Sequence, residues 1–225
     1  MTTAIVLAGG KSTRMGGGVD KAFLSIGAKP LVAWSLLSFE RTIGIDRIVL
    51  VVRKEQLLAA KAVVKMFGIS KLDKIVAGGA RRQESVQAGL AACDLDTRFV
   101  IIHDAARPCV TSELVTEVLQ AVKRADAVTV GRPVTDTIKR CAPTKGAVVE
   151  ETVSRDRLWS VQTPQAFAFG ALKAAYRKLD SKVEVTDDCQ AIELAGGTVK
   201  IVENLKPNFK VTTPDDALLV SALLK

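Results

Sequence analysis

Short runs of apolar, β-branched residues alternate along the chain with longer segments in which apolar residues recur every three or four positions. This alternation is typical of a parallel sheet covered by helices. Buried strands are predicted at residues 3–7, 47–52, 74–77, 99–103 and 127–131. Helices are predicted between them at residues 30–41, 54–67, 82–91 and 112–125, the last capped by Thr111 or Ser112. The predicted fold class is therefore α/β, a three-layer Rossmann-like arrangement around a mostly parallel sheet.

The rhythm of the pattern changes after Pro133. Two short strand-like segments, 136–140 and 147–153, are joined by turn-forming residues at 142–146, which predicts a β-hairpin. Farther on, the pattern predicts a return strand at 158–162, helices at 167–179 and 188–194, a strand at 198–202 and a final helix from Asp215. A hairpin that projects from a sheet exposes its edges unless another surface covers them. We therefore expect a single domain over residues 1–225, with a protruding β-arm at 134–158 that packs on a second subunit.

The composition is that of a globular protein, with 48% hydrophobic and 25% charged residues in a chain of 225, and it excludes intrinsic disorder. No apolar run reaches the roughly 18 residues that a membrane span needs, and no basic segment precedes the first strand. The four cysteines, Cys93, Cys109, Cys141 and Cys189, are far apart and form no C-x-x-C pair. We expect reduced cysteines and a cytoplasmic protein without a membrane partner.

Charge and the histidine count narrow the chemistry. Lys and Arg number 32 against 24 Asp and Glu, and a net charge of +8 suits an anionic partner such as a nucleic acid, a nucleotide or a sugar phosphate. His103 is the only histidine, which leaves one possible base for a catalytic triad and excludes a multi-histidine metal site. Any chemistry must therefore depend on Lys, Arg, carboxylates and backbone amides.

A glycine-rich segment, residues 7–21, follows the first predicted strand directly and reads LAGGKSTRMGGGVDK. Glycines allow the backbone N–H groups to approach a phosphate closely, and Arg14 and Lys21 add positive charge at the ligand-binding edge of the sheet. The segment fails the P-loop pattern, because the first glycine of that motif would fall on Ile5, and it also fails the dinucleotide fingerprint. Phosphate binding is the favoured interpretation, and a flexible strand-to-helix connection is the alternative.

A second group of charged residues follows the predicted strand 99–103, in the segment HDAARP at 103–108. Asp104 could hold a sugar hydroxyl or a metal ion there, and Arg107 could bind a phosphate with two parallel hydrogen bonds. The alternative is an Asp104–Arg107 ion pair that merely ends the strand. His103 has no partner motif and is interpreted as structural.

Together these segments resemble the nucleotidyltransferase superfamily and, more narrowly, the 2-C-methyl-D-erythritol 4-phosphate cytidylyltransferase family of the non-mevalonate isoprenoid pathway. The resemblance covers nearly the whole chain. Its carriers are LAGGKSTRM, DKAFLSIG, GGARRQESVQAGL, HDAARP, PVTDTIKR, TVSRDRLWSVQTPQAF, VTDDCQAIE and NFKVTTPDD. It implies the nucleotide-diphospho-sugar transferase type of sheet. It also implies transfer from CTP to 2-C-methyl-D-erythritol 4-phosphate, a polyol phosphate, which yields 4-diphosphocytidyl-2-C-methyl-D-erythritol and pyrophosphate.

The resemblance also assigns expected roles to individual residues. The nucleotide would be lined by Ala8, Gly9 and Gly10, with Gly79 and Ser85 beside the cytosine and ribose. Arg14 and Lys21 would clasp the triphosphate and, with Lys210, neutralise charge during the reaction. The methylerythritol phosphate would face Asp104, Arg107, Thr137, Thr186 and Lys210. Arg155 and Thr163 would reach the active site of the neighbouring subunit in a homodimer, and Mg²⁺ would bridge the CTP phosphates without a dedicated set of protein ligands.

Several of these residues also have ordinary structural interpretations. Lys210 alone would be predicted to face water, Thr186 to cap the helix at 188–194, and Thr163-Pro164 to end the return strand. Ala80 stands where the family often has an acidic residue. The segment LAGG and residues Val19 to Ala22 are more similar to the corresponding segments of molybdenum-cofactor guanylyltransferases.

Three alternative functions therefore stay open. Two are enzymes of the same fold, a ribitol-5-phosphate cytidylyltransferase and a molybdenum-cofactor guanylyltransferase. The third is a nucleic-acid-binding module, which the net charge suggests. Aromatic residues make up only 4% of the chain, and no RRM, KH or zinc-finger motif is present, so the sequence favours no nucleic-acid partner.

Overall fold

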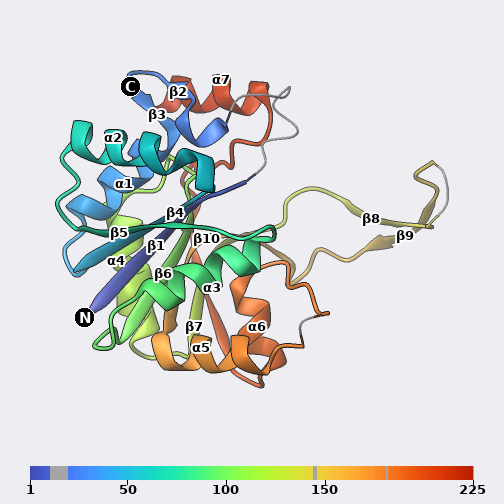
Figure 1. Cartoon of the computed structure of the whole chain (residues 1–225). Helices are drawn as coiled ribbons and strands as arrows, with labels where there is room; N and C mark the ends of the chain where they lie inside the picture. The colour runs from blue at the N-terminus through green and yellow to red at the C-terminus, as the bar shows by residue number, and fades with distance from the viewer. Residues whose placement is uncertain (11–19, 144–145, 181, 225) are drawn as a thin grey trace.

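A mixed, mostly parallel sheet forms the centre of the molecule (Figure 1). The computed structural model describes residues 1–10, 20–143, 146–180 and 182–224. Within these ranges the sheet contains seven strands in the order β11 (Val199–Glu203), β7 (Ala127–Pro133), β10 (Trp159–Ala168), β6 (Phe99–Asp104), β1 (Thr2–Ala8), β4 (Arg47–Val52) and β5 (Leu72–Ala77). All pairs are parallel except those of β10, which runs antiparallel to both β6 and β7.

Helices cover both faces of the sheet, so the predicted three-layer α/β fold is confirmed. One face packs against α1 (Leu31–Arg41), α2 (Leu57–Phe67) and α4 (Ser112–Val122). The other packs against α3 (Arg82–Ala92), α5 (Phe169–Lys178) and α6 (Asp188–Leu194). The continuous apolar run of β1 serves both layers, because successive side chains of a strand point to opposite faces. Ala4 and Val6 belong to the first core, and Ile5 and Leu7 to the second.

A third, smaller core holds the C-terminal part of the chain at the carboxyl edge of the sheet. It joins α7 (Pro214–Leu223) to the short strands β2 (Ser25–Ile26) and β3 (Lys29–Pro30) through Ile26, Leu31, Val211 and Val220. Thr213 caps α7 in a capping box with Asp216. Two 3-10 turns, η2 (Lys21–Phe23) and η3 (Lys54–Gln56), follow the ends of β1 and β4 in the chain. The C-terminal segment is therefore anchored beside the ends of the central strands.

The return strand is longer than the sequence pattern predicts. β10 extends to Ala168, so α5 begins at Phe169 rather than at residue 167, and Thr163-Pro164 lies inside the strand instead of ending it. The pairing of β10 with β7 shifts register between Gln162 and Gln165. A proline lacks the N–H that a regular strand position uses, and an irregular position in the ladder tolerates it.

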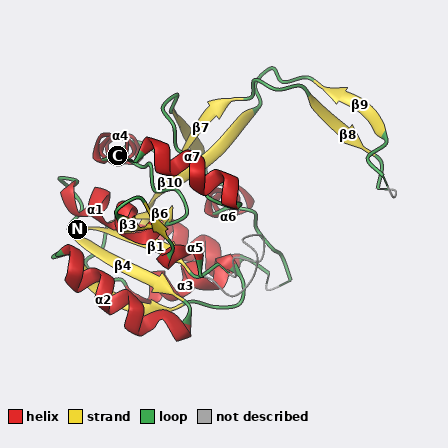
Figure 2. Cartoon of the chain, turned by 90° about the horizontal axis from the view of Figure 1, so that it is seen from above, coloured by secondary structure: helices red, strands yellow, loops and turns green. Residues whose placement is uncertain are grey.

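The predicted hairpin is present and extends away from the body (Figure 2). β8 (Ile138–Cys141) pairs antiparallel with β9 (Val149–Val153) as a separate two-stranded sheet. Both strands are somewhat shorter than predicted, and residues 144–145 of the expected connecting loop lie outside the described residues. The division into one domain and an arm with a role in dimerisation stays a prediction.

We predict that Gly89→Ala destabilises the protein by about 1–3 kcal/mol, because α3 lies too close to the sheet for an added methyl group. A Cβ at Gly89 would lie 2.5 Å from Ile5 Cγ2 and 3.2 Å from Val51 Cγ2. Urea unfolding measures the change in free energy. The control is Gly170→Ala in α5, where the added Cβ meets nothing within 4 Å; this variant should be as stable as the original chain or more stable. A Gly89→Ala variant of unchanged stability would contradict the packing described here.

Candidate functional site

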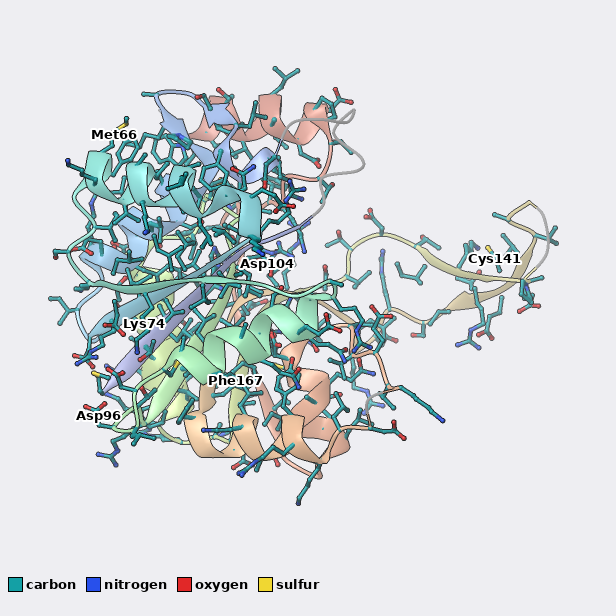
Figure 3. All side chains as sticks on the ribbon, viewed as in Figure 1. Met66, Lys74, Asp96, Asp104, Cys141 and Phe167 are labelled. Atoms are coloured by element: carbon teal, nitrogen blue, oxygen red, sulfur yellow. The ribbon has the colours of Figure 1, made fainter. Side chains whose placement is uncertain are left out.

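A cavity of about 290 Å³ opens at the carboxyl edge of the central strands, between the end of β1, the loop before α3 and the C-terminal segment. Figure 3 shows Asp104 at the side of the body from which the arm extends, with Asp96 at the opposite side. The cavity brings together eight of the predicted site residues: Ala8, Gly9, Gly10, Lys21, Gly79, Ser85, Asp104 and Lys210. Segments from both ends of the chain therefore form one site.

Asp104, the last residue of β6, is held between two cations. Lys210 Nζ lies 2.6 Å from Asp104 Oδ2, and Arg82 Nε lies 3.2 Å from Oδ1. Burial alone would raise the pKa of this carboxyl, but the charges of Arg82 and Lys210 hold it well below its usual range. Asp104 is therefore ionised at neutral pH. Lys210 is exposed, as the sequence alone predicts, yet its ammonium group faces the cavity rather than only water.

Arg82 is a site residue that the sequence analysis missed. It begins α3, lines the cavity, and forms a second ion pair in which its Nη1 lies 2.8 Å from Asp188 Oδ2. Burial alone would lower the pKa of Arg82, but the carboxylates of Asp188 and Asp104 raise it. The signal in the sequence was a pair of arginines between a predicted strand and a predicted helix, at the ligand-binding edge of the sheet.

The loop before α3 is shaped by a single carboxylate, that of Glu84. Its Oε2 accepts hydrogen bonds from the backbone N–H groups of Ala80 (2.8 Å) and Arg81 (3.1 Å), and its Oε1 accepts one from Arg81 Nε (2.7 Å). Gly79 is required here, because a Cβ at this position would lie 2.4 Å from Glu84 Cβ. The side chain of Ala80 adds no polar group to the cavity, so at Gly79 and Ala80 the loop presents backbone.

Lys21 lies at the start of η2, after the glycine-rich segment. Its Nζ donates a hydrogen bond to the carbonyl oxygen of Val211 at 3.1 Å, which ties the N-terminal segment to the C-terminal one. Asp20 caps η2 by accepting from the backbone N–H of Ala22, and its Oδ2 lies 3.5 Å from Arg53 Nε. Asp20 also lines the cavity, which the sequence analysis did not predict.

His103 is buried beside the site and is structural, as interpreted from the sequence. Its Nε2 lies 3.1 Å from the carbonyl oxygen of Arg107, which only accepts, so this nitrogen carries the proton. Its Nδ1 then accepts from Thr163 Oγ1 at 3.1 Å, and Thr163 Oγ1 accepts from the backbone N–H of Asp104 at 3.0 Å. Thr163 therefore lies buried next to Asp104 of its own chain, where it orients the end of β6.

The other predicted site residues that the structure describes do not line the cavity. Arg107 donates from Nη1 to the carbonyl oxygen of Asn208 at 2.8 Å and forms no ion pair with Asp104, whose partners are Arg82 and Lys210. Thr137 and Arg155 are exposed on the arm, where Arg155 donates to the carbonyl oxygen of Thr135. Arg14 lies outside the described residues.

Thr186 does not cap α6, contrary to the interpretation from the sequence. Asp187 is the N-cap, and it accepts from the backbone N–H of Gln190 at 2.9 Å. Thr186 is exposed, and its backbone N–H and hydroxyl both donate to Gln190 Oε1. The shift by one residue follows the capping preference for a carboxylate, which interacts more favourably with the helix dipole than a hydroxyl does.

We predict that His103 makes the protein less stable in mild acid. Complete burial lowers its pKa from 6.5 to about 4, so between these values the unfolded chain binds more protons than the folded one. The free energy of unfolding should therefore fall by up to about 3 kcal/mol as the pH falls through this window, at about 1.4 kcal/mol per pKa unit. Urea unfolding of the original protein and of His103→Gln at pH 7, 5.5 and 4 measures this fall in the free energy of unfolding. Parallel pH dependence of the two would show that His103 does not titrate this way; Asp104, with its pKa lowered, contributes only below pH 3.8.

Comparisons with known proteins agree with this geometry. A family model described as 2-C-methyl-D-erythritol 4-phosphate cytidylyltransferase matches residues 2–225. A relative of that name from Alkaliphilus metalliredigens (strain QYMF) is 40% identical over 224 residues, which is 99% of this chain and 92% of the relative. Another from Halalkalibacterium halodurans is 39% identical over 223 residues, covering 99% and 96% of the two chains.

Solved structures show the same likeness. The 4-diphosphocytidyl-2C-methyl-D-erythritol synthase of Anaerococcus prevotii DSM 20548 superposes with a TM-score of 0.85 at 30% identity, covering 99% of this chain and 97% of that one. The 2-C-methyl-D-erythritol 4-phosphate cytidylyltransferase of Thermus thermophilus has a TM-score of 0.79 at 31% identity, covering 99% and 98%. Because the family model matches nearly the whole length of this chain, the chain belongs to the 2-C-methyl-D-erythritol 4-phosphate cytidylyltransferase family.

Proposed function

We propose that this protein transfers CMP from CTP to 2-C-methyl-D-erythritol 4-phosphate, releasing pyrophosphate, as a step of non-mevalonate isoprenoid biosynthesis. Membership of the family supports the reaction. The observation that carries the proposal is the cavity itself, in which the backbone of Gly9 and Gly10 meets the Lys210–Asp104–Arg82 ion-pair cluster.

The charge of the cavity suits a nucleoside triphosphate. Its described lining contains four cationic side chains and two carboxylates: Lys21, Arg81, Arg82, Lys210, Asp20 and Asp104. The excess is positive, and backbone N–H groups at glycines add further donors for phosphate oxygens. Cations in a partly enclosed site interact with phosphate more strongly than cations in bulk water do. The surplus therefore favours binding of the most highly charged substrate, CTP.

The reaction requires no general base. The second pKa of a phosphomonoester is about 6, so the acceptor phosphate is mostly a dianion at neutral pH and is already a nucleophile. One of its oxygens forms a bond to the α-phosphorus of CTP, and the bond from this phosphorus to the β-phosphate oxygen breaks, so that pyrophosphate leaves with the electron pair. His103 stays neutral with both ring nitrogens in hydrogen bonds, and takes no part in proton transfer.

The protein would accelerate this step by positioning and by neutralising charge. Arg14 and Lys21 would hold the triphosphate, and Lys210 would face the reacting phosphates. Gly79 and Ser85 would lie at the cytosine and ribose, where the loop presents mainly backbone. Asp104 would accept hydrogen bonds from hydroxyl groups of the methylerythritol chain. Thr137 and Thr186 would add further contacts to the acceptor. Arg107 and Thr163 would act from outside the cavity, through their hydrogen bonds to Asn208 and Asp104.

Magnesium is the expected cofactor, and it would supply positive charge that neutralises the phosphates of CTP and the leaving pyrophosphate. Mg²⁺ keeps several waters and needs few protein ligands. The described residues contain no group of three or more His, Cys, Asp or Glu that could hold a metal by itself. Asp20 would hold the ion from the protein side, because its buried Oδ2 accepts no hydrogen bond from the described residues and has only the ion pair with Arg53 Nε at 3.5 Å. The chain therefore fits an ion that arrives with the nucleotide.

The arm is proposed to complete the site in a homodimer. Apolar side chains are exposed along it, with Val148 at 60% and Val149 at 53% exposure, and a lone two-stranded sheet is marginally stable in water. A second copy would cover these residues and bring Arg155 and Thr137 to the neighbouring cavity.

The proposed location is the cytoplasm, supported by the four unpaired cysteines. Within the described part of the chain, no helix is long and apolar enough to cross a membrane.

Lys21→Ala is expected to lower kcat with CTP and methylerythritol phosphate by about 10²- to 10³-fold, by analogy with the loss of one preorganised donor to a transition-state oxygen. The melting temperature should change little, since Lys21 is only half-buried. Pyrophosphate release measures turnover. The matched control is Lys61→Ala on the exposed side of α2, which should leave kcat unchanged. Similar turnover of Lys21→Ala and Lys61→Ala would contradict the assigned role.

The same assay separates the alternative functions. Each nucleoside triphosphate is tested with methylerythritol phosphate, ribitol 5-phosphate and the molybdenum cofactor as acceptors, and we expect turnover with CTP and methylerythritol phosphate. Activity with GTP alone would overturn the proposal. Tight, salt-dependent binding of RNA or DNA on filters, without turnover of CTP, would indicate a nucleic-acid-binding module instead.

Mixed dimers test whether the arm acts on the neighbouring subunit. Arg155→Ala and Lys21→Ala chains are each expected to be nearly inactive alone, because each lacks one half of every shared site. Unfolding and refolding them together should restore activity, since a mixed dimer contains one site with neither substitution. Light scattering checks that dimers form. Inactive mixed dimers, or a monomer in light scattering, would show that the sites are not shared.

A further inference from the structure

A line of polar side chains leads from the cavity, where it is partly exposed, into the interior between α3, α5 and α6. It begins at Asp104 and continues through Arg82, which lies 3.2 Å from Asp104 Oδ1 through Nε and 2.8 Å from Asp188 Oδ2 through Nη1. The exposure of the side chains falls from 30% at Arg82 to zero at Asp188. One guanidinium group therefore joins a cavity carboxylate to a carboxylate in the core.

Asp188 is fixed from three elements. The hydroxyl of Tyr176 in α5 donates to Asp188 Oδ1 at 2.5 Å, and the backbone N–H of Asp188 in α6 donates to Oε1 of Gln165 in β10 at 3.3 Å. Gln165 is itself held, since its Nε2 donates to Thr129 Oγ1 at 3.0 Å and to Asp187 Oδ2 at 2.7 Å. Asp188 therefore has little freedom to move, and neither does a group bound to it.

The chemistry of arginine suits this connection. Its planar guanidinium group presents donors in several fixed directions, so it can bind two carboxylates at once, whereas the single ammonium group of a lysine binds as a point charge. A buried carboxylate is costly unless it is paired, and complete burial raises the pKa of Asp188 while Arg82 acts in the opposite direction. Arg82 is thus held from the core side by Asp188, whose buried carboxylate is stabilised by this ion pair.

We propose that Arg82, Asp188 and Tyr176 are positioning residues for the acceptor subsite, which hold the Asp104 carboxylate aimed into the cavity. Tyr176 and Asp188 do not line the cavity, so they act through Arg82. The proposal rests on the proposed function, because the group they orient is the expected contact for the hydroxyls of the polyol phosphate. The alternative is a brace that holds α3, α5 and α6 together without effect on the substrate.

Asp188→Asn and Tyr176→Phe test this, each made in the original chain and in an Asp104→Asn chain. In the original chain, kcat/KM for methylerythritol phosphate should fall by about 10-fold or more, by analogy with the removal of partners that orient metal ligands. The Kd for CTP with magnesium, measured by calorimetry, should stay within about twofold, because the nucleotide contacts are unchanged. In the Asp104→Asn chain, neither substitution should lower kcat/KM for the acceptor further, since residues that act through one group are not additive.

Thr3→Val is the matched control for a lost buried hydrogen bond. Thr3 Oγ1 and Thr97 Oγ1 lie 3.2 Å apart, at the opposite edge of the sheet from the cavity. This variant and Tyr176→Phe should both lower the melting temperature, but in Thr3→Val the kcat/KM for the acceptor and the Kd for CTP should stay as in the original chain. Arg82→Lys is a further variant, made at the residue that joins Asp104 to Asp188. It should likewise lower kcat/KM for the acceptor in the original chain, and it should cause no further loss in the Asp104→Asn chain.

Two results would overturn the proposal. One is a loss of CTP affinity as large as the loss of kcat/KM for the acceptor. The other is a further loss of kcat/KM in the Asp104→Asn chain as large as the loss in the original chain. Either result would indicate a brace that holds the helices together. An original chain that binds CTP but transfers nothing to methylerythritol phosphate would instead contradict the proposed function.

Discussion

The ion pair between Asp104 and Lys210 joins residues that are 106 positions apart, and the site depends on it. It fixes where the C-terminal segment crosses the carboxyl edge of the sheet, together with a backbone hydrogen bond from Val211 to Ala106 at 2.8 Å. Lys21 then reaches the same segment through the carbonyl oxygen of Val211. Three parts of the chain thus form one rim, and a half-open cavity of opposite charges stays assembled although burying those charges is unfavourable.

The chemistry of the acceptor explains why such a rim needs no general base. A phosphate dianion brings its own negative charge to the reaction, so the protein needs cations and geometry rather than a proton acceptor. The only histidine is used accordingly, as a neutral hydrogen-bonded link between Thr163 and Arg107 beneath the site. Stability and catalysis therefore use different groups at the same strand end, which is why titration of His103 is expected to affect unfolding rather than the bond that forms.

Much of the fold was predictable, because hydrophobic periodicity reports burial on one or two faces. The strands, the helices, the hairpin and the convergence of Gly9, Asp104 and other residues at one edge follow from it. Periodicity has no direction, however, so it could not show that β10 runs antiparallel, or that its apolar residues up to Phe167 continue the strand rather than begin a helix. The partners of Arg82 were equally hidden, since a contact with Asp188 arises only when α3 and α6 pack on the same face.

The arm follows a different physical logic from the body. Among the described residues its two strands form a separate sheet without a third strand, so the hairpin cannot gain stability from a core of its own. Charged side chains such as Arg140 and Glu151, paired at 2.6 Å, discourage unspecific pairing of its edges with other chains. Val148 and Val149 nonetheless expose apolar surface, and the contact of this surface with water is unfavourable for a monomer. Charges that discourage most partners, together with an exposed apolar patch, are the properties that the proposed contact with a second copy requires.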